Sequence, residues 1–324
     1  MQAMRFHQLG EPNTLRLDTL PDPTPAPGEI CIGVAAAACN FADILVGQGK
    51  YQIRPELPFA PGSEVAGTVV AVGAGLEAPK VGTRVLATLP FGGYASQVVT
   101  TASNVVPIPA SMPFEHAAAF GVAYLTGYLG LVDRGALQRG ETLLVHAAAG
   151  GVGMAALQIG KALGARVIAS AGSEDKLALC RQQGADATIN YRDAGWPEQV
   201  KELTGGRGAD VVYDPVGGDT LHLSTKCIAF NGRIVIIGFA SGQIPELKLN
   251  RVMLKNIAVT GLHVGAYREH DPKRLREGTS ELLALYDDGR IAPIVSATYP
   301  LTQAGAALEA LAARRSTGKI VLLP

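Results

Sequence analysis

The glycine-rich stretch "VHAAAGGVGMAA", residues 145–156, is the part of the sequence best suited to hold a ligand against the backbone. It follows an apolar run typical of a strand and leads into residues spaced as in a helix. Gly150, Gly151 and Gly153 leave bare backbone, on which a diphosphate can lie against the amino end of that helix. Ala148 stands where the usual first glycine would be. We therefore predict a dinucleotide site, with an unliganded strand-to-helix turn as the alternative.

The end of the next predicted strand indicates which dinucleotide binds. About 20 residues beyond the glycine turn, an NAD site normally has an acidic residue for the ribose hydroxyls, but this strand ends in Ala-Ser-Ala-Gly at 169–172. Ser173 is a suitable helix N-cap, and Lys176 lies in the first helical turn, where a cation is unfavourable unless an anion is bound. Tyr191 and Arg192 end the following strand. The pattern predicts NADPH, bound through its 2′-phosphate. The alternative is that Lys176 is a solvated charge offset by two neighbouring acids.

Two later loops are expected to line the same site, because ligands of open parallel sheets bind at the carboxyl ends of the strands. The loop "DPVGGDT" follows the strand "ADVVY", and the loop "GFASG" follows "GRIVII". Gly217, Gly238 and Phe239 are therefore cofactor candidates, together with Val152 of the glycine turn. Asp214, which opens the first of these loops, is either a site residue or a turn-forming residue.

These loops require a sheet of parallel strands to position them. From residue 141 onward, runs rich in Val, Ile and Leu alternate with helical segments, which is typical of parallel strands buried on both faces. The sequence up to about residue 115 instead has short β-rich runs bounded by Gly or Pro, and 111–131 has a helical period. The predicted strands are 28–39, 63–73, 82–89, 94–100 and 104–109 in the first part, and 142–147, 165–171, 186–190, 209–215, 232–239 and 256–264 in the second.

The tail returns to a helix, strand, helix, strand order and ends on an apolar strand. We expect it to complete the first domain, which then consists of two segments. The predicted division is a β-rich domain of residues 1–120 and 266–324 and a nucleotide-binding domain of residues 121–265. The strand "NIAVTGLHV" is expected at the edge of the parallel sheet, where it would invite pairing with another subunit.

The composition argues against several other classes of protein. Basic and acidic residues balance at 28 each and no basic run occurs, so no nucleic acid partner is expected. No stretch of about 20 apolar residues is free of charge, so no membrane association is expected, and the first residues lack the apolar segment of a secretory signal. The four cysteines are scattered, which argues against a disulfide framework or a structural zinc lobe. We expect a cytoplasmic protein.

Five segments are the most specific features of the chain: "NFADI", "PGSEVAG", "HAAAGGVG", "INYR" and "TGKIVLLP". With them the chain resembles the medium-chain dehydrogenase/reductase superfamily, and within it the zinc-free quinone oxidoreductase branch of zeta-crystallin-like enzymes. The resemblance extends over essentially the whole chain. It implies an α/β protein with a GroES-like β-rich catalytic domain and a doubly wound parallel-sheet (Rossmann) domain that binds the nucleotide. It also implies a homodimer.

The resemblance implies further site residues. An amide and a tyrosine of the family's substrate site match Asn40 and Tyr51, which makes these the candidate catalytic residues. Thr126 in "YLTGY" is a candidate for the nicotinamide ribose, and Arg315 is included among the cofactor-binding candidates. The structural alternatives are a turn residue for Asn40, packing for Tyr51 and a hydrogen bond to its own backbone for Thr126.

No metal is expected. A catalytic zinc needs three Cys, His or carboxylate ligands around an open position. In the zinc-dependent relatives a cysteine occupies the position of Asn40, and a histidine occupies that of Ser63, directly before Glu64. Cys39 is adjacent, but neighbouring side chains on an extended segment point to opposite sides. Three histidines that lie beside the glycine turn or in apolar stretches have no neighbour at ligand spacing, and structural roles are expected for them: His116, His146 and His263.

Without a metal, the expected chemistry is reduction of a small-molecule acceptor that is already electrophilic, with hydrogen-bond donors at the developing oxyanion. The leading hypothesis is NADPH-dependent reduction of quinones. The rival in the same class is reduction of enones or enoyl thioesters, with Tyr51 donating the proton and Lys50 and Arg54 holding an acyl-CoA. The alternative from another class is a non-catalytic NADPH-binding protein with a structural or nucleic-acid-associated role.

Overall fold

The chain passes twice between two separately packed units. The computed structural model describes all residues, Met1–Pro324, and divides them into one unit of Met1–Val122 with Pro293–Pro324 and another of Ala123–Ala292. We name them after the roles expected from the sequence, the catalytic unit and the nucleotide unit. The two crossovers, between Val122 and Ala123 and between Ala292 and Pro293, are therefore the only covalent links between the units.

The nucleotide unit is built on a six-stranded sheet in the order β10-β9-β8-β11-β12-β13, with every neighbouring pair parallel. The order reverses between β8 and β11, and such a reversal is where doubly wound sheets bind ligands. The edge position expected for the last strand of this sheet is confirmed, since β13 pairs only with β12. The strands are β8 (Thr142–Val145), β9 (Arg166–Ala171), β10 (Ala187–Asn190), β11 (Ala209–Asp214), β12 (Ile228–Ile236) and β13 (Ala258–Gly261).

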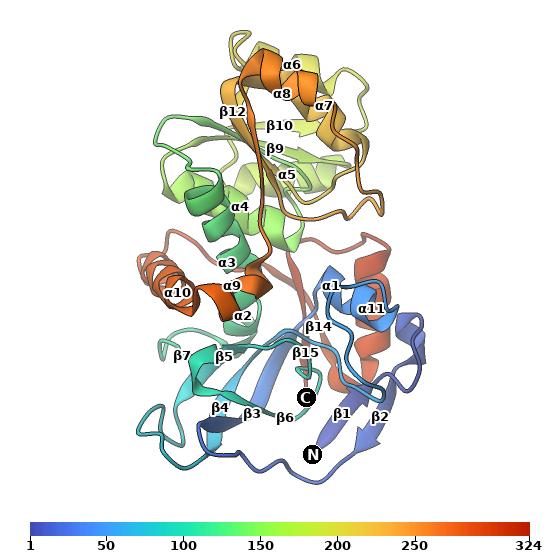
Figure 1. Ribbon diagram of the computed structural model, residues 1–324, viewed down its shortest axis with the longest axis vertical. Helices are drawn as coiled ribbons and strands as arrows, with labels where there is room; N and C mark the ends of the chain where they lie inside the picture. Colours follow the sequence, from blue (N-terminus) through green and yellow to red (C-terminus); the bar gives the residue numbers. More distant parts are fainter. The chain divides into compact units, whose positions relative to one another are not determined.

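Helices follow the strands of this sheet and cover its apolar residues. Figure 1 shows α4 and α5 beside β9 and β10. The core between helices and sheet contains Leu144, Ile168 and Trp196, each almost fully buried. The helices are α4 (Gly151–Ala162), α5 (Glu174–Gln182), α6 (Trp196–Leu203), α7 (Asp219–Cys227) and α8 (Leu249–Lys255).

The residues 266–292 pack in the nucleotide unit, which differs from the domain division expected from the sequence. They include most of α9 (Val264–His270) and all of α10 (Pro272–Asp287). Arg274 of α10 forms an ion pair with Asp133 at 2.7 Å, and its guanidinium lies over the ring of Tyr128. A hydrophobic pattern cannot predict such contacts. It indicates that strands resume after α10 but not which unit α10 packs against.

The catalytic unit has a mostly antiparallel sheet in the order β14-β15-β3-β4-β5-β7, with β6 also paired to β3. The strands β14 and β15 come from the second sequence segment of this unit, and Figure 1 shows α11 beside them. The small β1–β2 pair lies outside the predicted strands. The strands are β1 (Gln2–Arg5), β2 (Arg16–Thr19), β3 (Glu29–Ala38), β4 (Glu64–Val72), β5 (Arg84–Thr88), β6 (Gln97–Thr101), β7 (Val105–Pro107), β14 (Val295–Pro300) and β15 (Lys319–Leu323).

Short helices connect these strands. The helix α1 (Phe41–Gly47), which the sequence analysis did not predict, follows β3 directly. The expected helical period at 111–131 corresponds to α2 (Phe114–Ala118) and α3 (Gly121–Leu129), and α3 carries the chain across the first crossover. The helix α11 (Ala304–Ala312) precedes the last strand. None of the helices is long and apolar enough to cross a membrane.

Candidate functional site

The glycine turn joins β8 to α4 with no side chain capping the helix. Gly150 is the N-cap and makes no side-chain hydrogen bond to the first turn. A Cβ at Gly153 would lie 2.3 Å from the carbonyl oxygen of Ala147, so only glycine allows the helix to approach the turn this closely. At Gly150 the nearest atom to such a Cβ would be 3.3 Å away. The first N–H groups of α4 are therefore presented at a tight turn without a side-chain partner at the cap, which is the arrangement that binds anions.

The carboxyl end of β9 lies beside this turn and has no carboxylate. The N–H of Ala148 donates to the carbonyl of Ser170 at 2.9 Å, which ties the turn to β9. Directly after the strand, a Cβ at Gly172 would lie 2.4 Å from the hydroxyl oxygen of Tyr191. Tyr191, 41% exposed, therefore covers this glycine and stands next to Ser173, the N-cap of α5.

The first turn of α5 contains a lysine and two acids. Lys176 is half-buried and follows Glu174 and Asp175. Glu174 pairs with Arg181 of the same helix, which compensates its charge locally. The structure thus brings three predicted cofactor residues, Ser173, Lys176 and Tyr191, to the adjoining ends of β9 and β10.

The loops after β11 and β12 pack against each other. Gly217 has a φ of +67°, and a Cβ there would lie 2.7 Å from the ring of Phe239. A Cβ at Gly238 would meet nothing closer than 3.5 Å, so this position is open. Asp214 is fully buried and accepts the N–H groups of Val216 and Gly217 through one oxygen. Asp214 is therefore a turn-forming residue, while Gly217, Gly238 and Phe239 lie together at the carboxyl edge of the sheet.

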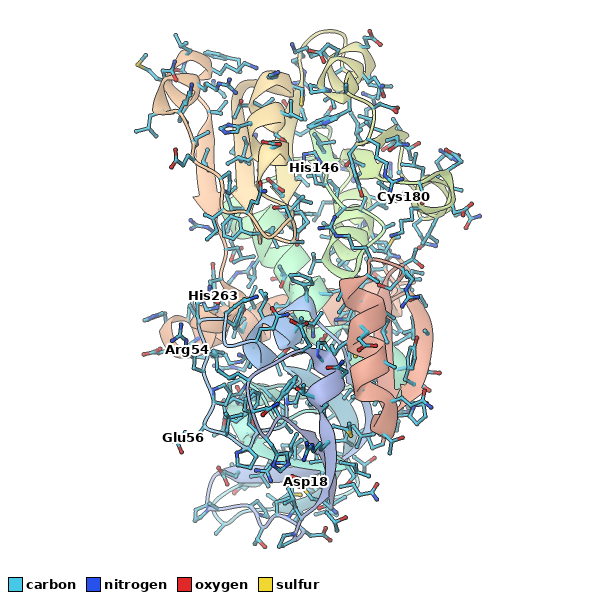
Figure 2. All side chains as sticks on the ribbon, turned by 90° about the vertical axis from the view of Figure 1, so that its right-hand side faces the viewer. Asp18, Arg54, Glu56, His146, Cys180 and His263 are labelled. Atoms are coloured by element: carbon cyan, nitrogen blue, oxygen red, sulfur yellow. The ribbon has the colours of Figure 1, made fainter.

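His146, beside the glycine turn, is held inside the nucleotide unit (Figure 2). Its Nε2 lies 2.8 Å from the hydroxyl of Ser224, which donates to the carbonyl of Thr220, so Nε2 carries the hydrogen. Its Nδ1 lies 3.2 Å from the hydroxyl of Ser170. Burial lowers the pKa of His146. A neutral imidazole with both nitrogens engaged serves to join three segments of the fold.

In the catalytic unit, Asn40 lies at the N-cap of α1 in a buried polar network. The Lys319 ammonium donates to the Asn40 side-chain oxygen at 2.6 Å and to Glu64 at 2.8 Å. The Asn40 amide nitrogen donates to the same Glu64 oxygen at 2.9 Å. The other Glu64 oxygen accepts the N–H of Val122 at 2.6 Å. Because Lys319 and Glu64 are 5% and 1% exposed, this ion pair sets the orientation of the Asn40 amide.

The two positions that hold zinc ligands in the zinc-dependent relatives face each other. The Asn40 amide nitrogen lies 3.3 Å from the Ser63 hydroxyl. Neither side chain is a usual zinc ligand, and the Lys319 ammonium next to Asn40 would repel a cation placed there. No group of three or more His, Cys, Asp or Glu side chains in the structure is arranged to hold a metal ion.

A second buried carboxylate, that of Asp43, supports α1. Asp43 accepts the N–H of Asn40 at 2.8 Å and the hydroxyl of Tyr94 at 2.9 Å through the same oxygen. Burial raises the pKa of Asp43 to about 6 and that of the neighbouring Cys39 thiol to about 12. Asp43 is therefore a structural acid whose ionisation is opposed by its surroundings.

The remaining candidates are divided between the units. Tyr51 lies shortly after α1, half-buried against the apolar core of the catalytic unit. Arg315 is exposed at a hollow of about 530 Å³ in that unit, which Ser296, Tyr299 and Thr317 also line. Thr126 is buried in α3, inside the nucleotide unit.

Sequence reasoning missed Lys319, although it lies in the conspicuous segment "TGKIVLLP". Its partner Glu64 is 255 residues away in sequence. An isolated lysine in an apolar terminal strand was the available signal, because a lysine placed in a buried strand needs an acidic partner.

The raised pKa of Asp43 predicts a pH-dependent stability. The pKa is about 6 in the folded protein and about 3.9 in an unfolded chain, so the folded state binds this proton more tightly. Ionisation of Asp43 therefore lowers the free energy of unfolding. This cost is absent below pH ~4, grows as the pH rises, and is complete above pH ~6. Asp43→Asn lacks this cost at every pH. We expect wild type to gain up to about 3 kcal/mol over Asp43→Asn as the pH falls from about 7 to about 4.

Urea unfolding of both proteins at a series of pH values measures this difference. The comparison with Asp43→Asn cancels the contributions of acids that do not interact with Asp43. A difference in unfolding free energy that does not change with pH would contradict the assignment.

The chain is similar to known oxidoreductases over its whole length. The model of the alcohol dehydrogenase GroES-like domain matches residues 26–110, and that of the zinc-binding dehydrogenase matches residues 151–283. The quinone oxidoreductase of Pseudomonas aeruginosa is 39% identical, covering 100% of this chain and 99% of the relative. A quinone oxidoreductase-like protein 2 homolog of Nematostella vectensis is also 39% identical, covering 99% and 88%.

Solved structures agree with these relatives. The Escherichia coli quinone oxidoreductase complexed with NADPH has a TM-score of 0.94 at 35% identity and covers 100% of both chains. The CurK enoyl reductase has a TM-score of 0.90 at 28% identity and covers 99% of both. The two units are thus a GroES-like domain and a Rossmann-like domain. The chain belongs to the quinone oxidoreductase branch of the medium-chain dehydrogenase/reductase superfamily.

Proposed function

We propose that this protein is an NADPH-dependent quinone reductase that works without a metal. The observation that carries the proposal is the pairing of an uncapped α4 amino end with a β9 end that lacks a carboxylate and holds Ser173, Lys176 and Tyr191 instead. The first feature fits a diphosphate and the second fits a further phosphate on the adenosine ribose. Relatives named quinone oxidoreductase over nearly the full chain support the acceptor class.

The residues of the nucleotide unit fit NADPH. The N–H groups at the amino end of α4 would hold the diphosphate, and the hydroxyl of Ser173 with the ammonium of Lys176 would hold the 2′-phosphate. Gly217, Gly238 and Phe239 would line the site further along the sheet edge, and Thr126 stays a candidate for it. Arg315, which belongs to the catalytic unit, stays a cofactor candidate. When bound, NADPH supplies the hydride that reduces the acceptor.

The polar groups of the catalytic unit support the metal-free chemistry of this proposal. The position of a zinc ligand is taken by Asn40, whose oxygen accepts from the Lys319 ammonium at 2.6 Å. A quinone needs no Lewis acid because it is already electrophilic, and hydrogen bonds to the oxygen that gains negative charge are sufficient help. We assign that role to Tyr51, and to Asn40 the shaping of the acceptor site.

Reduction of enoyl thioesters is the second candidate. Lys50 and Arg54, on either side of Tyr51, are both exposed, and Figure 2 shows Arg54 at the surface. Two cations there would suit the phosphates of an acyl-CoA, and the CurK enoyl reductase is a neighbour in fold.

An acceptor panel tests the proposal. NADPH oxidation is followed with a benzoquinone, an alkenal and an enoyl-CoA, and we expect the largest kcat/KM with the quinone. Tyr51→Phe should lower that value about tenfold or more, since it removes one donor to the developing oxyanion. Dominant turnover of the enoyl-CoA would establish the second candidate instead. Turnover of none of the three would leave a nucleotide-binding protein without catalysis.

The nucleotide preference is tested by fluorescence titration. We expect NADPH to bind more tightly than NADH. Lys176→Ala should weaken NADPH about tenfold and leave NADH unchanged, because a charge-assisted contact to the 2′-phosphate is worth roughly 1.5–3 kcal/mol. Lys273→Ala, on the exposed face of α10, is the control. Equal affinities for NADPH and NADH in wild type would reject the assignment.

We also propose that two copies pair through the nucleotide unit. The edge strand β13 has a free side, and five large apolar side chains of this unit are at least 66% exposed: Phe230, Ile244, Leu249, Met253 and Leu254. A second copy would cover them. A cytoplasmic location stays a prediction.

Sedimentation equilibrium tests the pairing. Wild type should have twice the mass of one chain. Leu254→Glu should shift the protein toward monomer by placing a charge in the buried surface, whereas Leu9→Glu, at an exposed leucine of the catalytic unit, should not. A monomeric wild type at micromolar concentration would contradict the proposal.

A further inference from the structure

Both crossovers between the units are attached to one side chain of the nucleotide unit. Tyr124 lies two positions after Val122, the last residue of the first catalytic segment, and Ala292 is the last residue before the second. The two points are far apart in sequence. In the structure each is hydrogen-bonded to Gln158, which is on α4.

The Gln158 amide uses its full bonding capacity in these contacts. Its Oε1 accepts the hydroxyl of Tyr124 at 2.6 Å and the N–H of Ala292 at 2.9 Å. Its Nε2 donates to the carbonyl of Ala292 at 3.0 Å and to the side chain of Gln183 at 2.8 Å. An amide has two acceptor sites and two N–H donors, so no bonding capacity is left over.

This position would ordinarily hold an apolar residue. Gln158 is 5% exposed, and the buried residues around it on α4 are Gly, Met, Ala, Leu and Ile. Leu or Met would fill the space but leave the N–H and carbonyl of Ala292, an exposed residue, without these fixed partners. A neutral side chain that both donates to and accepts from one backbone residue acts on it as a neighbouring strand would. Its placement at Ala292 fixes the direction in which the chain leaves the nucleotide unit.

The helix that carries Gln158 is the one that begins at the glycine turn. Gly151 and Gln158 are seven residues apart on α4, about 10 Å along a rigid helix. A displacement of α4 caused by an anion at its amino end therefore moves the anchor of both crossovers.

We propose that Gln158 is a positioning residue that links the nucleotide turn to both crossovers. It thereby sets where the chain leaves and re-enters the catalytic unit. The kinetic consequence rests on the proposed function. The mechanical link does not, because it concerns only contacts inside the nucleotide unit and the two chain connections.

Three single variants separate the link from general support of the helix. Gln158→Met keeps the length of the side chain and removes all four hydrogen bonds. Tyr124→Phe removes the hydrogen bond from the hydroxyl of Tyr124 to Gln158 at the first crossover. Gln183→Ala removes a bond to Gln158 that involves neither crossover, and it is the matched control.

The first measurement is hydrogen exchange at the Ala292 amide, which needs no turnover. We expect exchange at least about tenfold faster in Gln158→Met than in wild type, because local opening then breaks no bond at this amide. NADPH should slow exchange at Ala292 in wild type and in Gln183→Ala but not in Gln158→Met. Unchanged exchange in Gln158→Met, with or without NADPH, would overturn the proposal.

The second measurement separates cofactor binding from acceptor turnover. In Gln158→Met we expect the Kd of NADPH to stay within about threefold and the acceptor kcat/KM to fall about tenfold or more, since small misplacement of reacting groups is costly. Tyr124→Phe should give a smaller fall and Gln183→Ala none. A loss of NADPH affinity equal to the loss of kcat/KM would show that Gln158 merely supports α4, and would overturn the proposal.

The two proposals fail in different ways. If wild type turns over no acceptor, the quinone reductase proposal fails while exchange at Ala292 still decides the role of Gln158. If Gln158→Met does not fold, Tyr124→Phe supplies the decision, because it should lower kcat/KM without changing the Kd of NADPH. A Tyr124→Phe protein with wild-type kcat/KM would then overturn the link.

Discussion

The approach of α4 to the glycine turn is the constraint on which the nucleotide unit depends. Helix amino ends leave N–H groups that must find a partner, and most helices provide one with a capping side chain. Here the cap is Gly150, and the packing at Gly153 is so close that a Cβ would lie 2.3 Å from the Ala147 carbonyl. The small residues thus provide neither a capping side chain nor side-chain packing. This is favourable only if water or an anion accepts hydrogen bonds from the N–H groups at the helix end.

The catalytic unit is subject to a different constraint, because it buries charged side chains. Lys319, Glu64 and Asp43 are all nearly inaccessible, so one cation faces two carboxylates. Buried ion pairs are weak sources of stability because desolvation offsets the attraction. The imbalance falls on Asp43, which has its pKa raised by burial to about 6. Apolar residues of similar volume are often at least as stable as a buried ion pair, so we regard the network as one that orients Asn40 rather than one that stabilises the fold.

Local patterns were sufficient for the parallel sheet and for the glycine turn, because a strand, a run of small residues and a helix follow one another in the chain. The loops after β11 and β12 were also predictable, since parallel strands place their carboxyl ends together. The helix α1 was missed, although Asn40 followed by Asp43 is the spacing of an N-cap with an acid in the first turn. The contacts of Lys319 with Glu64 and of Gln158 with Ala292 could not be predicted, because they join segments 255 and 134 residues apart. The boundary near 293 was missed for the same reason, since periodicity shows that α10 has a buried face but not what that face meets.

The end of β9 and the position of Asn40 are similar in their electrostatics. At the end of β9, a carboxylate would repel a ribose phosphate, and the sequence instead has small residues followed by Ser173 and Lys176. At the position that holds a zinc ligand in the zinc-dependent relatives, Asn40 accepts from the Lys319 ammonium, whose charge disfavours a nearby cation. In each place the charge that remains excludes one class of ligand as well as favouring another, and specificity of this kind needs both effects. An extra phosphate on the cofactor and an acceptor that needs no metal are therefore parts of one proposal, because each rests on a lysine beside the position concerned, Lys176 after β9 and Lys319 at Asn40.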